Sequence, residues 1–295
     1  VQTCALPIST VKLGGFEGYK TQLLELNNII ILGCGTSYHS GLWALEIFRD
    51  LDIFDNIIVC DGSEFTYKDI PKNGKTGVIL ISQSGETSDL YKCMELIQEY
   101  HLLKIGVVNV PDSLIARETD CGVYLNAGRE VSVASTKSFT NQCIVLTMIA
   151  IWFSQNKGTC YEKRIKMIQD LQNLPFHINN ILNKQQQITE EMITKLKDST
   201  SILLLGKGQC RAIAFEGSLK LKELAYIHSE GFSVSSLKHG PFALIKDDLP
   251  IIIIDTNENN RTICRNAMQE VKARGAYVIR ITENESSDES EENIL

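Results

Sequence analysis

Hydroxyl side chains, an amide and a glycine directly follow an apolar run near residue 80. The run is Val78-Ile79-Leu80-Ile81, and Ser82-Gln83-Ser84-Gly85-Glu86-Thr87 comes next, before a helix-like pattern over residues 90–102. Unpaired N–H groups at a helix N-terminus favour anions, and a glycine lets the backbone approach one closely. The loop lacks the Gly-Lys-Ser/Thr of a nucleotide P-loop. We therefore expect a cradle for a small phosphorylated molecule, with an ordinary turn capped by Thr87 or Ser88 as the alternative.

Ionisable residues gather on a predicted helix near residue 220. Lys220 stands four residues after Glu216 and three before Glu223, so the three side chains share one helix face. A base beside an ammonium group is what proton transfer at a carbon atom requires. The alternative is an exposed stripe of salt bridges.

A histidine lies just before another predicted helix. His239 precedes Gly240-Pro241, and proline suits the first turn of a helix, so we expect His239 in the loop before it. Histidine suits acid–base chemistry near neutral pH, with a surface loop histidine as the alternative. That simpler interpretation is adopted for the remaining histidines, which are His39, His101, His177 and His228.

The polar stretch Asn126 to Lys137 precedes an apolar segment, residues 143–153, that is typical of a buried helix. Ser135 and Thr136 could cap this helix or donate hydrogen bonds to a ligand. Their spacing favours capping.

An internal repeat defines the elements that must position these residues. Ile29-Ile30-Ile31-Leu32-Gly33-Cys34-Gly35 returns as Ile202-Leu203-Leu204-Leu205-Gly206-Lys207-Gly208, at an offset of 206 − 33 = 173 residues. The same offset joins the apolar runs at 78–81 and 251–254, and those at 104–108 and 277–281. The chain therefore holds two copies of one α/β unit. Apolar strands alternating with helical patterns predict a parallel sheet with helices on both faces in each copy.

Composition narrows the class of protein. A chain of 295 residues with 43% hydrophobic content can bury two cores, and its net charge of −7 argues against nucleic acid as the main partner. Residues 143–153 are too short to span a bilayer, and no signal-peptide pattern is visible. The 9 cysteines form no C-x-x-C pair, which favours reduced thiols in a cytoplasmic protein over a zinc or redox site.

Several segments lie outside the repeated pattern. Residues 1–10 show no periodicity, and we expect a foreign scar there. Residues 157–198 have apolar residues at helical spacing, so they predict a helical connector in which Pro175 separates two helices. Glu283 to Asn293 have the composition of a solvated loop. Ile294-Leu295 could begin a further strand, so we expect the second copy to be C-terminally incomplete.

Together these motifs resemble the isomerase half of the glutamine–fructose-6-phosphate aminotransferases, which consists of two sugar isomerase (SIS) domains. The resemblance implies a first SIS domain at residues 20–156 and a second at 199–295. The matching segments are Cys34-Gly35-Thr36-Ser37, Ser63-Glu64-Phe65, Ser82 to Thr87, Asn109-Val110, Arg117 to Asp120, Asn126 to Lys137, Glu216 to Glu223 and Leu237 to Pro241.

The resemblance implies roles for individual residues. Glu223 would move a proton between C1 and C2 of the open-chain sugar, and Lys220 would assist deprotonation at the adjacent hydroxyl. His239, reached from the neighbouring subunit of a homodimer, would open the ring. No metal or organic cofactor is implied. The residues that would hold the phosphate are Ser82, Gln83, Ser84 and Thr87, and those that would line the sugar are Thr36, Ser37, Val133 and Ser135.

The resemblance further implies an enzyme that makes glucosamine 6-phosphate from fructose 6-phosphate and glutamine, at the start of the UDP-N-acetylglucosamine pathway. A glutaminase domain is expected in the same full-length chain. This sequence departs from the family pattern at Ser235 and Ser236, where relatives carry Gly-Glu. It also lacks the glutaminase domain, so it should not release ammonia from glutamine, and it lacks the tail that brings a lysine into the sugar site.

Two alternatives stay open at this stage. One is another SIS phosphosugar isomerase or deaminase. The other is a non-catalytic sugar-phosphate sensor, against which the joint presence of Lys220, Glu223 and His239 argues.

Overall fold

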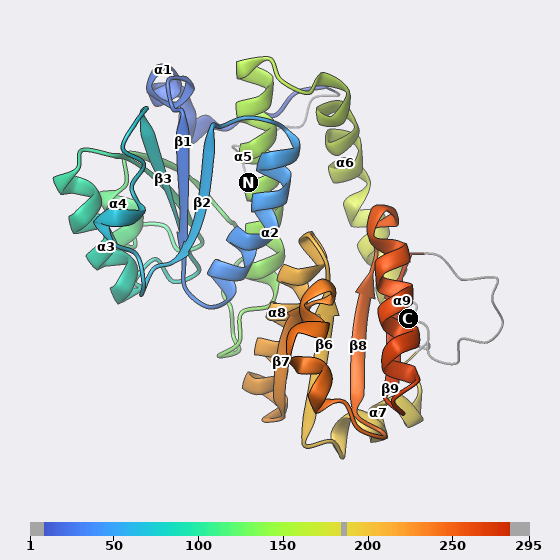
Figure 1. Ribbon diagram of the computed structural model, residues 1–295. Coiled ribbons are helices and arrows are strands. Elements are labelled where there is room, and N and C mark those ends of the chain that lie inside the picture. Colours follow the sequence, from blue (N-terminus) through green and yellow to red (C-terminus); the bar gives the residue numbers. More distant parts are fainter. Residues whose placement is uncertain (1–8, 184–187, 284–295) are drawn as a thin grey trace. The chain divides into compact units, whose positions relative to one another are not determined.

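The computed structural model describes residues 9–183 and 188–283, which divide into two compact units (Figure 1). The first unit is Val1–Pro175 and the second is Phe176–Leu295. Most of the expected scar at residues 1–10 lies outside the described residues. The expected strand start at Ile294-Leu295 and all but the first residue of the expected solvated loop lie outside them too.

The first unit contains a five-stranded parallel sheet with the strand order β2-β1-β3-β4-β5. Its strands are β1 (Asn28–Gly33), β2 (Asn56–Asp61), β3 (Thr76–Ser82), β4 (Leu103–Val108) and β5 (Cys121–Tyr124). Its α-helices are α1 (Lys20–Leu24), α2 (Thr36–Asp50), α3 (Ser88–Glu99), α4 (Leu114–Glu118) and α5 (Lys137–Lys157), with short 3₁₀ helices η1 (Gly14–Tyr19) and η2 (Tyr67–Asp69).

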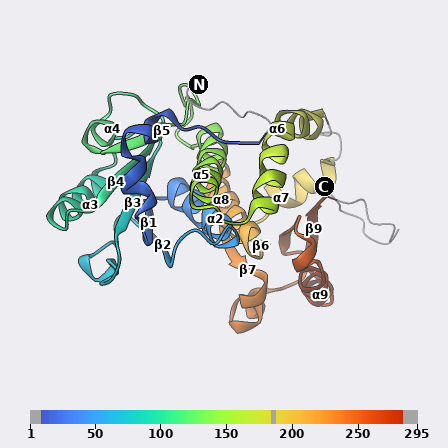
Figure 2. The same ribbon diagram turned by 90° about the horizontal axis from the view of Figure 1, so that it is seen from above.

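Alternate side chains of each central strand enter different cores. Ile29 and Ile31 of β1 pack in the core that contains α2 and α5, whereas Ile30 and Leu32 pack in the core that contains α3 and α4. Figure 2 shows these two pairs of helices on opposite sides of the strands. A strand that is buried on both faces must be apolar throughout, which explains the uninterrupted runs in the sequence. The predicted buried helix at residues 143–153 is the central part of α5.

The second unit repeats this arrangement with a four-stranded parallel sheet, β7-β6-β8-β9. Its strands are β6 (Ser201–Gly206), β7 (His228–Ser233), β8 (Pro250–Asp255) and β9 (Tyr277–Thr282). Its helical segments are α7 (Glu190–Lys197), α8 (Gln209–Lys220), the π-helical turn η4 (Leu221–Ala225), α9 (Arg261–Lys272), and the 3₁₀ helices η5 (Val234–His239), η6 (Pro241–Leu244) and η7 (Glu258–Asn260). One core packs against α9 and the other against α8.

The two sheets confirm the predicted repeat and fold class. The offset of 173 carries β1 onto β6 residue for residue, and the strands β3 and β4 correspond to β8 and β9 within one residue. The matching strands also hold the same places in their sheets. In the first sheet β1 lies between β2 and β3, and in the second sheet β6 lies between β7 and β8.

The prediction that Pro175 separates two helices is wrong. The helix α6 (Tyr161–Asn183) continues through Pro175. A proline inside a helix removes one backbone hydrogen bond. The carbonyl group that loses its partner is that of Leu171, four residues earlier. Leu171 is only partly buried and Pro175 is exposed, so water can reach this carbonyl group.

A buried ion pair links the ends of β8 and β9. Arg280 and Asp255 are 3% and 2% exposed, and Nη2 and Nε of Arg280 donate to Oδ2 of Asp255 over 2.7 and 3.2 Å. A buried charge without its partner is strongly destabilising. The two strands are therefore joined by more than their backbone hydrogen bonds.

We expect Arg280→Met to lower the free energy of unfolding by about 3–5 kcal/mol, because it leaves the Asp255 carboxylate buried without a counter-ion. The control is Lys75→Met, which breaks an ion pair whose Lys75 and Glu25 side chains are 65% and 50% exposed and should cost under about 1 kcal/mol. Urea unfolding followed by circular dichroism measures both. Tryptophan fluorescence is a reference for the first unit, since Trp43 and Trp152 both lie in it. Equal losses in the two variants would contradict the expectation.

Candidate active site

Two loops leave the carboxyl edge of the first sheet at its centre. β1 ends at Gly33 and β3 ends at Ser82, and these strands are parallel neighbours. The helix after β1 packs on one face of the sheet, whereas the helix after β3 packs on the other. Such a reversal opens a crevice at the carboxyl ends of the strands, where open α/β sheets bind ligands.

The loop from Ser82 to Thr87 is shaped by its own hydroxyl groups. Oγ of Ser82 accepts from the N–H of Gly85 at 2.9 Å and lies 2.9 Å from Oγ1 of Thr87. Oγ of Ser84 accepts from the N–H of Glu86 at 3.1 Å. Thr87 does occupy the N-cap position of α3, but its side chain makes no capping bond. The structure thus brings Ser82, Ser84 and Thr87 together, with Gln83 half-buried between them.

The turn that begins α4 supports this loop from behind. Gly85 has a φ of +69°, and a Cβ at this position would lie 1.9 Å from Oγ of Ser113. The N–H of Ile115 donates to the carbonyl of Gly85 at 3.0 Å, and the N–H of Leu114 donates to Oε1 of Glu86 at 2.8 Å. Only glycine combines this backbone conformation with so close a contact.

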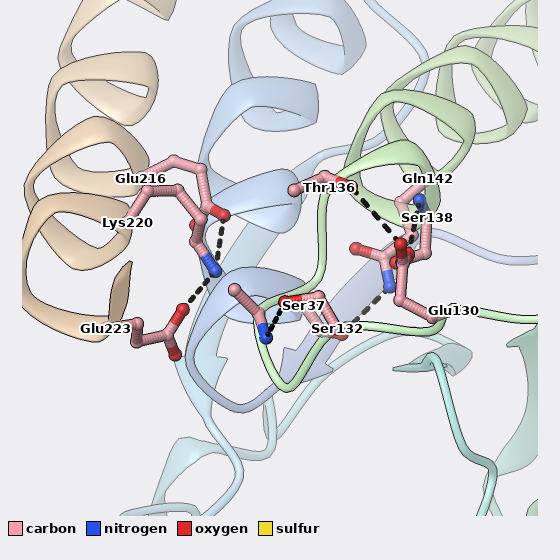
Figure 3. A network of polar contacts seen from close by, with 10 residues as sticks. Ser37, Glu130, Ser132, Thr136, Ser138, Gln142, Glu216, Lys220 and Glu223 are labelled. Atoms are coloured by element: carbon pink, nitrogen blue, oxygen red, sulfur yellow. Dashed lines mark hydrogen bonds and ion pairs between the residues drawn. The ribbon is translucent and has the colours of Figure 1, made fainter. Parts of the chain in front are cut away.

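The residues after β1 are mostly buried. Thr36 and Ser37 open α2 and are 9% and 7% exposed. Oγ of Ser37 accepts a hydrogen bond from Nε2 of Gln142 on α5 at 2.9 Å (Figure 3). Burial raises the pKa of the Cys34 thiol, and the nearby Asp61 carboxylate raises it further. Cys34 is therefore a protonated thiol at neutral pH rather than a nucleophile.

The loop after β5 carries the other predicted sugar-lining residues. Val133 is fully exposed, and Ser135 is half-buried. The expected capping of α5 by Ser135 or Thr136 is wrong, because Thr136 holds the N-cap position without a capping bond from its side chain.

Glu130 takes that capping role instead. Its Oε2 accepts from the N–H and Oγ of Ser138 at 3.1 and 2.7 Å, and its Oε1 accepts from Oγ1 of Thr136 at 3.1 Å (Figure 3). Burial alone would raise the pKa of Glu130, but the hydrogen bonds from Ser138 and Thr136 together lower it below its ordinary value. Local capping patterns do not reach back eight residues, so sequence reasoning missed this residue.

In the second unit, the predicted carboxylates and lysine form one cluster. Nζ of Lys220 lies 3.3 Å from Oε1 of Glu216 and 2.5 Å from Oε2 of Glu223 (Figure 3). The side chain of Glu216 is 7% exposed, whereas that of Glu223 is 32% exposed. Glu216 therefore holds the ammonium group from the buried side, and the Glu223 carboxylate is partly exposed to solvent.

The backbone around Glu223 departs from the α-helix that the sequence predicts. α8 ends at Lys220, and Glu223 lies in the π-helical turn η4, which ends before Tyr226 at a φ of +56°. Turns of this type occur often at functional sites. The predicted shared face nevertheless holds, since Lys220 contacts both carboxylates.

His239 is the last residue of the 3₁₀ helix η5, and it is exposed. The expectation that His239 lies in a loop before a helix is therefore inexact, because His239 ends one 3₁₀ helix and Pro241 begins a second, η6, with only Gly240 between them. Within residues 9–183 and 188–283, no three His, Cys, Asp or Glu side chains gather as a metal site would require.

Comparison with known proteins identifies the family. The model of the SIS domain family matches residues 22–152 and 195–294. A glutamine–fructose-6-phosphate aminotransferase [isomerizing] of Chlorobaculum tepidum is 41% identical over 92% of this chain and 44% of its own length. The enzyme of the same name from Saccharomyces cerevisiae is 38% identical over 91% of this chain and 37% of its own length. The chain thus spans less than half the length of these relatives.

A solved structure gives the same result. The C-terminal domain of glucosamine-fructose-6-phosphate aminotransferase from Francisella tularensis is 30% identical, with a TM-score of 0.88 over 96% of this chain and 80% of that chain. The resemblance drawn from the motifs is confirmed. The chain belongs to the SIS domain family and, within it, to the C-terminal isomerase part of the glutamine–fructose-6-phosphate aminotransferases.

Proposed function

We propose that this chain carries the sugar-phosphate isomerase activity of an enzyme that makes glucosamine 6-phosphate from fructose 6-phosphate and glutamine. The observation that carries the proposal is the loop from Ser82 to Thr87, whose hydroxyls surround the start of α3 at the central crevice of the first sheet. Ser82, Gln83, Ser84 and Thr87 hold the phosphate of the sugar. The field of a helix N-terminus supports such binding even in a chain of net negative charge.

The proposed chemistry is a proton transfer between C1 and C2 of the open-chain sugar. The Glu223 carboxylate removes the proton from one carbon and returns it to the other, so the site is unchanged after a cycle. The Lys220 ammonium beside it assists deprotonation of the adjacent hydroxyl. His239, from the neighbouring subunit of a homodimer, opens the ring. Thr36, Ser37, Val133 and Ser135 line the sugar.

The proposal extends to the complete protein. A glutaminase domain in the same full-length chain supplies ammonia, and the enzyme acts in the cytoplasm. None of the described helices combines the length and the apolarity that crossing a bilayer would need. Within this chain, we propose SIS domains at residues 20–156 and 199–295 with a helical connector at 157–198.

We expect Ser84→Ala to weaken the binding of fructose 6-phosphate by about tenfold, because it removes one hydroxyl that faces the phosphate site. Isothermal titration measures the affinity. Thr194→Ala on α7 is the control, since that exposed hydroxyl donates to the carbonyl of Glu190 on the same helix. Equal affinity of the wild type for fructose and fructose 6-phosphate would contradict a phosphate site at this loop.

We expect Glu223→Gln to slow isomerisation by about 10²–10⁴-fold while sugar binding persists, because glutamine keeps the shape of the side chain but cannot accept a proton. Loss of deuterium label from C1 of fructose 6-phosphate, followed by NMR, measures the step. Glu190→Gln, at an exposed position on α7, is the matched control. Exchange that continues undiminished in Glu223→Gln would remove this residue from the reaction.

A further inference from the structure

The carboxylate of Glu130 closes a nine-residue loop in front of α5. Both of its oxygens are engaged: Oε2 accepts from the backbone and side chain of Ser138, and Oε1 accepts from Thr136. Ser138 is completely buried in the first turn of α5. The loop from 130 to 138 is thus tied at its base to the most buried helix of the first unit.

A carboxylate suits this position for two reasons. Hydrogen bonds to a charged acceptor are about twice as strong as those between neutral groups. The N-terminus of the 21-residue helix α5 also favours negative charge. The lowered pKa of Glu130 shows that the charged form is the one that the surrounding donors stabilise.

The chain that enters the loop is held as well. Asn109 follows β4 and is 8% exposed, and its amide donates to the carbonyl of Gly128 at 2.8 Å while its oxygen accepts from the N–H of Ala127 at 2.9 Å. Between these fixed points, the N–H of Ala134 donates to Oγ of Ser132 at 3.2 Å, and the Ala134 side chain is completely buried, whereas its neighbours Val133 and Ser135 are exposed and half-buried. The exposed Val133 therefore lies between the buried Ala134 and the base of the loop that Glu130 closes.

We propose that Glu130 is a positioning residue for sugar recognition: by closing the loop from 130 to 138, it presents Val133 and Ser135 to the sugar in one fixed shape. This role rests on the proposed function. Glu130 acts through Thr136 and Ser138 and does not itself touch the substrate. The phosphate loop at residues 82–87 is held by other hydrogen bonds. A mutation of Glu130 should therefore weaken the binding of the sugar without weakening the binding of phosphate.

The test compares two ligands, fructose 6-phosphate and inorganic phosphate, on the whole chain. Glu130→Ala should weaken fructose 6-phosphate binding by about tenfold. This is the loss expected if about a tenth of the variant molecules have the loop 130–138 in the conformation that binds the sugar. Phosphate binding should change by less than about twofold. Glu130→Gln should give an intermediate loss, because its amide oxygen can still accept from Ser138. Amide hydrogen exchange should accelerate at Ser138 in Glu130→Ala. Glu99→Ala, an exposed glutamate at the end of α3, is the control.

The outcomes separate the two proposals. If the wild type binds fructose 6-phosphate and Glu130→Ala binds it equally well, the positioning role is overturned and the proposed function stands. If Glu130→Ala loses both ligands equally, the residue supports the fold generally, and the positioning role is again overturned. If the wild type fails to bind fructose 6-phosphate at all, the proposed function fails, and this role fails with it.

Discussion

An open parallel sheet with helices on both faces must send its connections to opposite faces at some point, and no helix covers the ends of the strands there. In the first unit this point lies between β1 and β3, because α2 and α3 pack on opposite faces of the sheet. The loop at 82–87 and the start of α2 both lie there. The loop after β5 is joined to the same edge through Asn109, whose N–H donates to the carbonyl of Ser82 at 3.3 Å. The polar residues of the first unit thus owe their proximity to the order of the strands.

The same topology in the second unit carries different chemistry. At the offset of 173, Ser82 corresponds to Asp255, which is buried and paired with Arg280, and Ser84 corresponds to Asn257, whose side chain caps η7. An internal carboxylate at this edge repels an anion and already holds the nearest guanidinium group. The second copy instead carries a cluster of ionisable side chains, Glu216, Lys220 and Glu223, on α8 and η4. One fold therefore appears twice in the chain with different polar side chains at equivalent positions.

Sequence periodicity was sufficient for β1, β3 and β4 and their counterparts β6, β8 and β9, because strands buried on both faces must be apolar and a repeat fixes their spacing. It did not predict β5 or β7, since β5 has only four residues and β7 has the polar sequence His228–Ser233. The Lys220 and Glu223 contact followed from helical spacing alone. What could not be predicted depends on tertiary contacts. The hydrogen bonds from Ser138 to Glu130 join residues eight positions apart, and no local sequence pattern predicts them. No local pattern predicts the π-helical turn at Glu223 either. Pro175 misled the prediction because an exposed helix can lose one hydrogen bond to solvent without ending.

The close approach of Gly85 and Ser113 restricts which residues can replace them during the evolution of this sequence. Oγ of Ser113 is buried without a hydrogen-bond partner among the described residues, so its hydroxyl adds little to stability. Its place is set by the space that the glycine leaves open. A larger residue at 113 would push into the loop, and any side chain at 85 would meet Ser113 first. Substitutions at residue 113 are therefore limited to side chains no larger than serine. A smaller residue at 113 would not by itself admit a side chain at position 85, where the φ of +69° still favours glycine.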